Sequence, residues 1–306
     1  MDQEKTVAIL LAVYNGEKHL SALLESLLKQ DYPFIEIHVR DNCSTDNTVN
    51  MLQEWQKSYP TKISLHFSKQ NVGVIGNFAL LLELTSAPYL MFCDGDDVWK
   101  TDKVSKTLAK MQELELLHGK DFPLLVHTDL TVVDENLKVI APSFWAYSRL
   151  NTTKSCQSLP RLLVQNHVTG CTVLINRCLK NLALPIPLNC VMHDWWIALV
   201  AACFGKVSAL KASTIYYRQH SSNDTGAKSY RLNAFLKRKR AEVTSGKIQQ
   251  AKFLLERYGS KISIQNRLIL NDYLRMQVSQ GWARLFIMFR HGFFKTGFLR
   301  NFILNH

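Results

Sequence analysis

Short apolar runs alternate with amphipathic stretches over the first hundred positions of the chain. The runs at 7–13, 35–41, 63–67 and 89–93 have the length expected of buried strands. Between them, apolar residues at helical spacing predict helices over 17–30, 46–58 and 73–84. Strands and helices that alternate at such short intervals predict an α/β fold, with a mostly parallel central sheet and helices on both faces.

The second half of the chain follows a less regular order. We predict a helix over 103–118, strands over 124–129 and 131–140, a strand over 170–175, a helix over 194–204 and a strand over 207–218. From about residue 228 the pattern is helical and basic to its end. We therefore expect one large α/β domain over 1–225 and a basic, amphipathic helical region over 226–306.

Charge is distributed unevenly along the chain. The 37 Lys and Arg against 25 Asp and Glu give a formal net charge of +12. Residues 228–306 hold 16 Lys and Arg against 3 Asp and Glu, so the excess lies at the C-terminal end. Such a region indicates an anionic membrane surface, a diphosphate-bearing acceptor or nucleic acid as partner. A solvated helical surface is the alternative.

The cysteines and the apolar runs indicate a compartment. Seven cysteines, an odd number without a C-x-x-C pair, suit free thiols in a reducing cytoplasm. The run at 7–13 is too short for a signal peptide, and no run approaches the roughly 20 apolar residues that span a bilayer. We expect a cytoplasmic protein, or one held at the cytoplasmic face of the inner membrane.

Polar residues follow three of the predicted strands directly. Tyr14 follows the first strand, Asp41 ends the second, and Asp94-Gly95-Asp96-Asp97 follows the fourth. Ligands of open α/β sheets bind beyond the carboxyl ends of the strands, so we expect these residues to line one cleft. Two carboxylates one residue apart can hold a hard divalent cation, which would neutralise a departing diphosphate as a Lewis acid. An isolated D-x-D is also common in solvated loops.

Six motifs resemble those of the family-2 glycosyltransferases with the GT-A fold. They are Ala12-Val13-Tyr14-Asn15-Gly16, Val39-Arg40-Asp41-Asn42-Cys43-Ser44-Thr45-Asp46, Asn71-x-Gly73 with Asn77, Asp94-Gly95-Asp96-Asp97-x-Trp99, His193-Asp194-Trp195-Trp196 and Tyr217-Arg218-Gln219-His220-x-x-Asn223. The last two are similar to the bacterial rhamnosyltransferase-like branch, and the likeness covers roughly residues 5–226. Asn42 stands where the family usually has a second acidic residue, which leaves the ribose contact open.

The resemblance implies an inverting, metal-dependent transferase that moves a sugar from a nucleoside diphosphate to a carbohydrate. Nucleotide-binding residues would then be Val13, Tyr14, Asp41, Asn42, Asn71, Gly73, Asn77, Asp94 and Gly95. Tyr14 would lie against the base, and Asp41 would accept a hydrogen bond from the ring N–H of uracil or thymine. The alternatives are a turn residue packed on the sheet edge for Tyr14, an Asx turn or cap for Asp41, and a surface polar group for Asn77.

The same resemblance places the general base at Asp194. Inverting transfer needs a carboxylate that takes the proton from the attacking acceptor hydroxyl. His193, Trp195, Trp196 and Gly170 would contact the acceptor or the donor sugar. An N-cap of the following helix is the alternative role for Asp194, and one of the two tryptophans could simply fill the core.

The metal would be Mn²⁺ or Mg²⁺, held by Asp94, Asp96 and His220. A neutral imidazole favours Mn²⁺, which tolerates nitrogen ligands better than Mg²⁺ does. A loop histidine bonded to backbone is the alternative for His220.

The last two motifs favour dTDP-L-rhamnose as donor and a surface polysaccharide as product. A UDP-hexose or a UDP-N-acetylhexosamine is the alternative donor, and the acceptor would be a saccharide or a lipid-linked saccharide. The stretch 282–300 mixes bulky apolar residues with Arg and Lys, which is typical of an interfacial helix on an anionic membrane. A helix packed back onto the catalytic domain is equally compatible. A membrane-surface or nucleic-acid binding module is the non-enzyme alternative, but an acidic cleft argues against a nucleic-acid partner.

Overall fold

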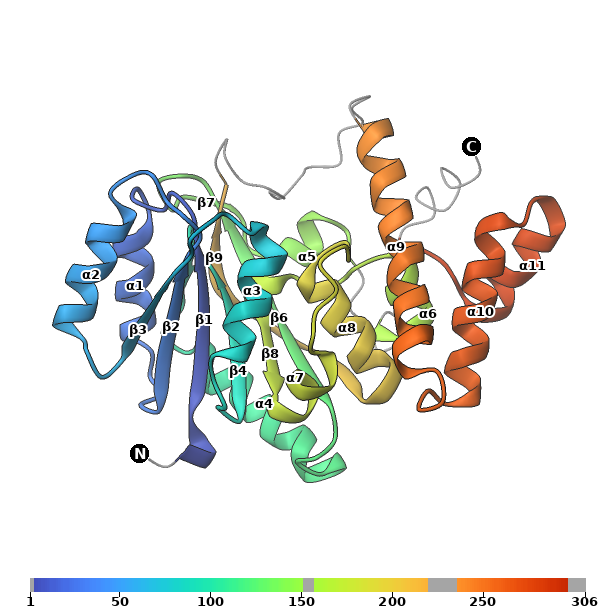
Figure 1. Cartoon of the computed structure of the whole chain (residues 1–306), viewed down its shortest axis with the longest axis horizontal. Helices are drawn as coiled ribbons and strands as arrows, with labels where there is room; N and C mark the ends of the chain where they lie inside the picture. Colours follow the sequence, from blue (N-terminus) through green and yellow to red (C-terminus); the bar gives the residue numbers. More distant parts are fainter. Residues whose placement is uncertain (1–2, 151–156, 220–235, 297–306) are drawn as a thin grey trace.

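The computed structural model describes residues 3–150, 157–219 and 236–296 (Figure 1). Its strands are β1 (Val7–Val13), β2 (Ile35–Asp41), β3 (Ile63–Phe67), β4 (Tyr89–Asp94), β5 (Val98–Trp99), β6 (Leu124–Val133), β7 (Val139–Ala141), β8 (Val173–Asn176) and β9 (Lys206–Arg218). Its helices are α1 (Leu20–Leu28), α2 (Thr48–Ser58), α3 (Gly73–Glu83), α4 (Lys103–His118), α5 (Phe144–Tyr147), α6 (Leu159–Val164), α7 (Arg177–Ala183), α8 (His193–Phe204), α9 (Leu236–Tyr258), α10 (Ile264–Val278) and α11 (Gly281–His291). Two 3₁₀ turns that are labelled η1 (Gln3–Lys5) and η3 (Gly170–Thr172) complete the set.

One sheet organises the described chain. Its strand order is β3-β2-β1-β4-β8-β6-β9-β5, with β7 paired to β6. The first four strands in this order are parallel to one another, whereas β8 runs antiparallel to both β4 and β6. The parallel half is the sequence of alternating strands and helices that the hydrophobic pattern predicts, so the α/β fold class is confirmed.

The sheet has a hydrophobic core on each face. Successive side chains of a strand point to opposite faces, and β1 shows the alternation clearly. Val7, Ile9, Leu11 and Val13 pack with α1, α2 and α4 in one core, whereas Ala8 and Leu10 pack with α3 and α8 in the other. Because both faces are covered, β1 is apolar at every position, as parallel central strands require.

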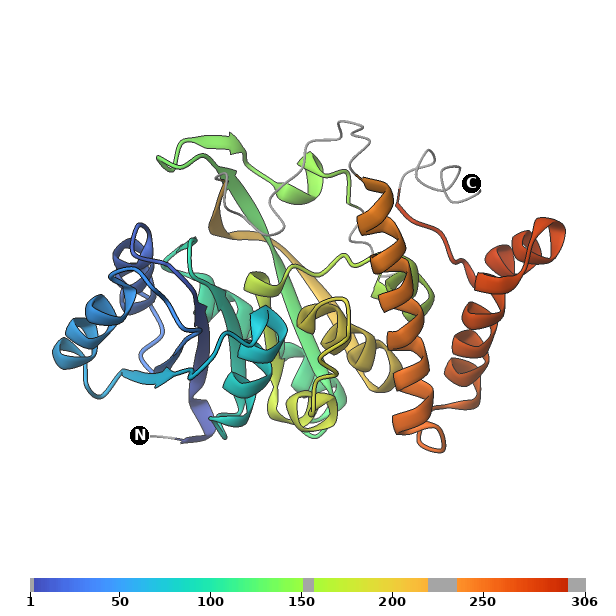
Figure 2. The same ribbon diagram turned by 45° about the horizontal axis from the view of Figure 1, so that its top comes forward.

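The three C-terminal helices extend the second core. Buried residues of α9, α10 and α11 belong to the same hydrophobic cluster as Trp196 of α8 and Phe78 of α3. In both views α9 lies beside α8, while α10 and α11 form the outer end of the molecule (Figures 1 and 2). Among the described residues, none of the helices combines the length and the hydrophobicity needed to cross a bilayer.

Two predicted elements differ from the structure. The two strands expected over 124–129 and 131–140 are one long strand, β6, followed by the short β7, because the chain stays extended through Leu130. The strand expected from Gly170 begins only at Val173, since residues 170–172 form the turn η3. This second difference matters for the site, because η3 lies beside its acidic residues.

The junction of α8 and β9 generates a stability prediction. A Cβ at Gly205 would lie 1.8 Å from the Pro123 carbonyl oxygen, which also accepts a hydrogen bond from Lys206. Gly205→Ala should therefore lower the free energy of unfolding by about 3 kcal/mol, since backbone must move to relieve the contact. Gly292→Ala is the comparison: this left-handed C-cap has no atom within 4 Å of the added Cβ, and should cost about 1 kcal/mol. Equal losses in chemical denaturation would contradict the prediction.

Candidate active site

A buried carboxylate and an exposed aromatic ring lie together at the carboxyl ends of β1 and β2. Asp41 pairs with Val13 in the parallel register, and Tyr14 follows Val13 with 53% of its surface exposed. The Ser44 backbone N–H donates to Asp41 Oδ2 at 3.0 Å, whereas Oδ1 is buried without a hydrogen-bond partner in the described chain. A buried unpaired carboxylate oxygen is costly, and a ligand N–H would relieve that cost.

The neighbouring asparagines hold the loop that leads into α3. The Asn42 side-chain amide donates to Asn71 Oδ1 at 2.9 Å and accepts from the Val72 backbone N–H at 3.0 Å. Asn71 Oδ1 also accepts from the Gly73 backbone N–H at 2.9 Å. The amide of Asn42 is thus engaged at both ends within the protein, and its contact with a ribose stays a prediction.

Asn77 lies between α3 and β2. It is 2% exposed, donates to the Arg40 carbonyl at 3.2 Å and accepts from the Arg40 guanidinium at 3.4 Å. The alternative of a surface polar group is therefore wrong for Asn77. Its side chain fixes α3 against the end of β2, and a contact with the donor phosphates stays a prediction.

The acidic turn after β4 forms the centre of the site. Ligand atoms of Asp94, Asp97 and Cys171 lie within 4.8 Å of one another. Asp97 is fully buried and accepts from the Arg218 backbone N–H at 3.2 Å. Burial and the charges of Asp96 and Asp94 raise its pKa well above the usual range. Asp97 therefore lies on the buried side of the acidic turn, where it is bonded to β9.

Asp94 and Asp96 have the oxygen donors that a hard divalent cation takes, but the grouped ligand atoms are those of Asp94, Asp97 and Cys171, so Asp96 as a ligand stays a prediction. Both carboxylates are partly exposed, and Mg²⁺ and Mn²⁺ take oxygen ligands. Burial raises the pKa of the Cys171 thiol well above its usual range. A sulfur ligand is soft, and Mg²⁺ and Mn²⁺ prefer carboxylate oxygens over it. Gly95 between the two carboxylates lies against β1, where an added Cβ would be 3.6 Å from the Ala12 carbonyl oxygen.

Arg218 fixes the acidic turn from the end of β9. Its Nε donates to the Asp96 carbonyl oxygen at 2.9 Å, and its terminal nitrogen donates to the Glu135 carbonyl. Arg218 is 5% exposed, so its guanidinium group is buried between the two carbonyl oxygens that accept its hydrogen bonds. The predicted metal ligand His220 lies two positions further on, outside the described residues.

A fully buried lysine lies next to the acidic cluster and places a positive charge near its carboxyl groups. Lys103 Nζ donates to the Cys171 carbonyl oxygen at 3.0 Å and lies 4.3 Å from the centre of the Trp99 ring. Burial lowers its pKa to about 8, and the nearby carboxyl groups of Asp97 and Asp94 oppose that shift. The sequence analysis missed Lys103, because a lysine at the start of an amphipathic helix is ordinarily solvated.

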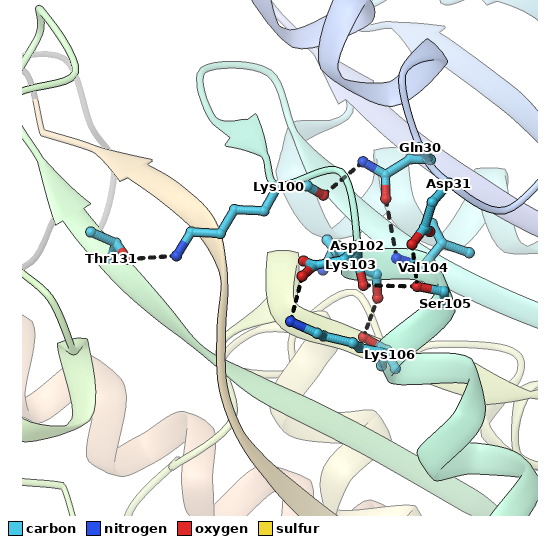
Figure 3. Close-up of polar contacts among 10 residues, drawn as sticks. Gln30, Asp31, Lys100, Asp102, Lys103, Val104, Ser105, Lys106 and Thr131 are labelled. Carbon is cyan, nitrogen blue, oxygen red and sulfur yellow. Dashed lines mark hydrogen bonds and ion pairs between the residues drawn. The ribbon is translucent and has the colours of Figure 1, made fainter.

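The start of α4, which carries Lys103, is anchored by the two residues Gln30 and Asp31 that follow α1. The Gln30 side chain donates to the Lys100 carbonyl at 2.9 Å and accepts from the Val104 backbone N–H at 3.1 Å (Figure 3). Ser105 donates to Asp31 at 2.7 Å in the same cluster. These bonds satisfy a first-turn N–H of α4 and fix the helix end from which Lys103 reaches the cluster.

Asp194 lies in the first turn of α8, with 7% of its surface exposed. Met192 is the N-cap residue of that helix, so the N-cap alternative for Asp194 is wrong. Burial raises the pKa of Asp194 to about 7, against the opposing effect of backbone N–H groups and of the Asn166 amide, which donates at 3.4 Å. A carboxylate that titrates near neutrality suits proton transfer.

The turn η3 connects the two carboxylate groups of the site. A Cβ at Gly170 would lie 3.4 Å from both Asp194 Oδ2 and His193 Nε2. The next residue, Cys171, contacts the cluster of Asp94 and Asp97. Two adjacent residues of η3 thus lie between the candidate base Asp194 and the acidic turn. Asp94 and Asp194 are about a hundred positions apart in the sequence, so their proximity cannot be read from it.

His193 is enclosed by aromatic rings. Its ring centre lies 4.1 Å from that of Phe78 and 5.4 Å from that of Phe92, and the residue is 3% exposed. Burial lowers the pKa of His193 to about 3, so the ring is neutral. His193 lies buried next to Gly170, and a contact between His193 and an acceptor stays a prediction.

The two tryptophans of α8 lie in the core. Trp196 is 0% exposed and donates through its indole nitrogen to the Ala183 carbonyl at 2.9 Å. Trp195 is 7% exposed and donates to the Leu162 carbonyl at 2.7 Å. Their satisfied N–H groups and their burial favour the packing role over an acceptor contact.

Comparisons with known proteins agree with this arrangement. Residues 8–117 match the model of the family Glycosyl transferase family 2. The chain is 29% identical over 235 residues to the dTDP-rhamnosyl transferase RfbG of Shigella flexneri, a match that covers 71% of this chain and 74% of that protein.

Solved structures extend the likeness to the whole fold. The TarS structure (residues 1–349) from S. aureus, in complex with UDP-GlcNAc, superposes with a TM-score of 0.55 at 18% identity, covering 88% of this chain and 79% of that one. The mannosyltransferase PcManGT from Pyrobaculum calidifontis, with GDP-Man and Mn²⁺, gives a TM-score of 0.58 at 14% identity, covering 92% and 72%. Residues 8–117 therefore form a family-2 glycosyltransferase domain, and the chain shares the fold of the GT-A glycosyltransferases.

The shifted pKa of Asp194 predicts a pH dependence. A carboxylate that acts as the predicted general base must be ionised, so nucleoside diphosphate release from the cognate donor should rise with pH through about 7. Asp194→Asn should lower turnover by about two to four decades at pH 8, where the wild-type carboxylate is ionised, and by less as the pH falls below about 7.

Stability provides the control for this substitution. The folded-state pKa of Asp194 lies above its unfolded value, so ionisation at alkaline pH costs folding free energy. Asparagine removes that cost, and the Tm of Asp194→Asn at pH 8 should equal or exceed that of the wild type. A lower Tm with unchanged turnover would show that Asp194 is structural.

Proposed function

Starting from the family-2 glycosyltransferase domain over residues 8–117, we propose that the chain is an inverting, metal-dependent hexosyltransferase. It transfers a sugar from a nucleoside diphosphate to a saccharide or lipid-linked saccharide. The observation that carries the proposal is the placement of Asp194, whose burial raises its pKa to about 7, next to the turn that contacts Asp94. A proton acceptor and a metal-binding carboxylate at one site are what inverting transfer to a hydroxyl requires.

The nucleotide lies at the ends of β1 and β2 in this proposal. Asp41 Oδ1 accepts the ring N–H of uracil or thymine, because it is a buried acceptor without a partner in the described chain. The exposed ring of Tyr14 packs on the base, and Val13 lines the same end of the sheet. The loop from Asn71 to Gly73 lies beside the ribose.

Asp94 and Asp96 would hold the divalent cation, with His220 as a further ligand. When bound, the cation supplies charge neutralisation for the nucleoside diphosphate leaving group. Arg218 fixes the Asp96 backbone, so this turn is held before any ligand arrives. The Mn²⁺ of PcManGT and the oxygen-rich donor set support Mn²⁺ or Mg²⁺.

Asp194 takes the proton of the acceptor hydroxyl as that oxygen attacks the anomeric carbon. The bond to the diphosphate breaks on the opposite side, so the anomeric configuration inverts. Gly170 lets the sugar approach Asp194, because its missing side chain leaves that face of the carboxylate uncovered. The backbone N–H groups of Gly170 and Trp195 and the amide of Asn166 hold the carboxylate in place.

dTDP-β-L-rhamnose is the proposed donor, and an α-L-rhamnoside in a bacterial surface polysaccharide is the proposed product. The similarity to RfbG supports this donor over a UDP-sugar. A UDP-hexose or UDP-N-acetylhexosamine is the second candidate, which the likeness to TarS with bound UDP-GlcNAc favours.

The proposed site of action is the cytoplasmic side of the inner membrane. Residues 1–225 form the catalytic domain in this proposal, and the basic region 226–306 keeps it close to lipid-linked acceptors. Residues 228–306 hold 16 Lys and Arg but only 3 Asp and Glu, and this positive charge supports an anionic surface as partner.

A donor screen tests the proposal. The purified chain should release nucleoside diphosphate from dTDP-L-rhamnose, or from one of the UDP-sugars, and EDTA should abolish release. Asp96→Ala should lower the metal-dependent rate by at least about two decades, because the diphosphate loses its counter-charge. The exposed Asp121 offers a control, and Asp121→Ala should retain the wild-type rate. Turnover that persists in EDTA, or a fully active Asp96→Ala, would overturn the metal assignment.

A further inference from the structure

We propose that α11 docks the protein on an anionic lipid bilayer through an exposed aromatic face, which consists of Trp282, Phe286 and Phe289. The inference deepens the proposed membrane association, and it does not depend on which donor the enzyme uses. Figures 1 and 2 both show α11 at the outer end of the molecule, on the side of α10 away from the sheet.

The three aromatic residues form one stripe. They stand at positions i, i+4 and i+7 of a regular helix, a spacing that brings side chains onto the same face. Their exposed fractions are 86% for Trp282, 66% for Phe286 and 71% for Phe289. Single exposed apolar residues are common, but three large rings on one helical face form a patch that indicates a binding surface.

The opposite face of α11 is firmly packed. Ile287 and Met288 are buried in the core that extends from α8, and Phe293 follows them with 0% exposure. His291 Nε2 lies 2.8 Å from Asp272 Oδ2 of α10. The helix is thus fixed on its inner side, and the aromatic face points outward because of that packing. The packed helix that the sequence offered as one alternative therefore holds for the inner face of α11, and the interfacial role of its outer face belongs to the proposal.

Positive charge borders the aromatic face. Residues 264–291 contain four arginines and a single acidic residue, Asp272. The Asp272 side chain is 4% exposed and lies within ion-pair distance of Arg275 and Arg290, whose own side chains are 75% and 51% exposed. Arg290 therefore borders the rings on α11, one position after Phe289, and Arg275 adds a second exposed guanidinium group on α10, while the carboxylate of Asp272 is buried.

This combination fits an anionic bilayer better than a second copy of the chain. Two copies that met through this face would bring their arginines together, whereas anionic headgroups attract each basic residue by about 1 kcal/mol. Trp and Phe rings bind at the boundary between headgroups and acyl chains. The 11 residues of α11 span about 16 Å, so the helix would lie in the plane of the membrane surface.

Vesicle sedimentation tests the proposal with the full chain. The wild type should bind vesicles of phosphatidylglycerol and phosphatidylcholine, and bind pure phosphatidylcholine much less. The triple variant Trp282→Ser, Phe286→Ser, Phe289→Ser should bind the anionic vesicles at least about tenfold more weakly, because three rings no longer leave water. Leu116 and Leu117 of α4 are 89% and 70% exposed, so the double variant Leu116→Ser, Leu117→Ser is the matched control and should bind as the wild type does.

A second measurement avoids any doubt about folding of the triple variant. Brominated lipids in the anionic vesicles should quench part of the tryptophan fluorescence of the wild type, and Trp282→Phe should lose that quenched component while it still sediments with vesicles. Equal vesicle binding by the wild type and the triple variant would overturn the proposal. So would a wild-type dimer that becomes monomeric in the triple variant without any vesicle binding. Donor turnover, measured separately without lipid, reports on the proposed function independently.

Discussion

The structure depends most on the close contact between the turn η3 and the carboxylates on either side of it. Gly170 lies against Asp194, and Cys171 contacts Asp94 and Asp97. A Cβ at the first position would already be in van der Waals contact with the candidate base, and a shift of the turn would change the distance between base and acidic cluster. Because the reaction needs both groups around one anomeric carbon, the geometry of this short turn constrains the whole site.

Two buried cations hold η3 and the acidic turn after β4 in place. Lys103 donates to the Cys171 carbonyl from beneath the site, and Arg218 donates to the Asp96 carbonyl from its rim. Several carboxylates at one sheet edge repel one another, and burial of charge is costly unless counter-charges and hydrogen bonds compensate it. The chain therefore surrounds its acidic cluster with two basic residues from different elements before any metal ion binds.

The hydrophobic pattern predicted the parallel half of the sheet well, and the site only in part. Strands such as β1 and β2 begin and end where the apolar runs do, because both faces of the sheet are covered and turn residues follow directly. Tyr14, Asp41 and Asp94 were found because each stands at a strand end. Lys103 and Asn166 were missed, since their roles come from contacts across about 70 and 28 positions that leave no periodic signal. The α8 tryptophans look like ligand contacts in the sequence, but tertiary packing buries them.

The central claim is that a metal-assisted nucleotide site lies at the ends of β1, β2 and β4. Calorimetric titration of the chain with dTDP and with UDP, with Mn²⁺ and after treatment with EDTA, tests it most directly. We predict that at least one of the two nucleotides binds with Mn²⁺ in a one-to-one complex, and that EDTA weakens the binding by at least about tenfold. Failure of both nucleotides to bind, or equal affinity with and without metal, would contradict it.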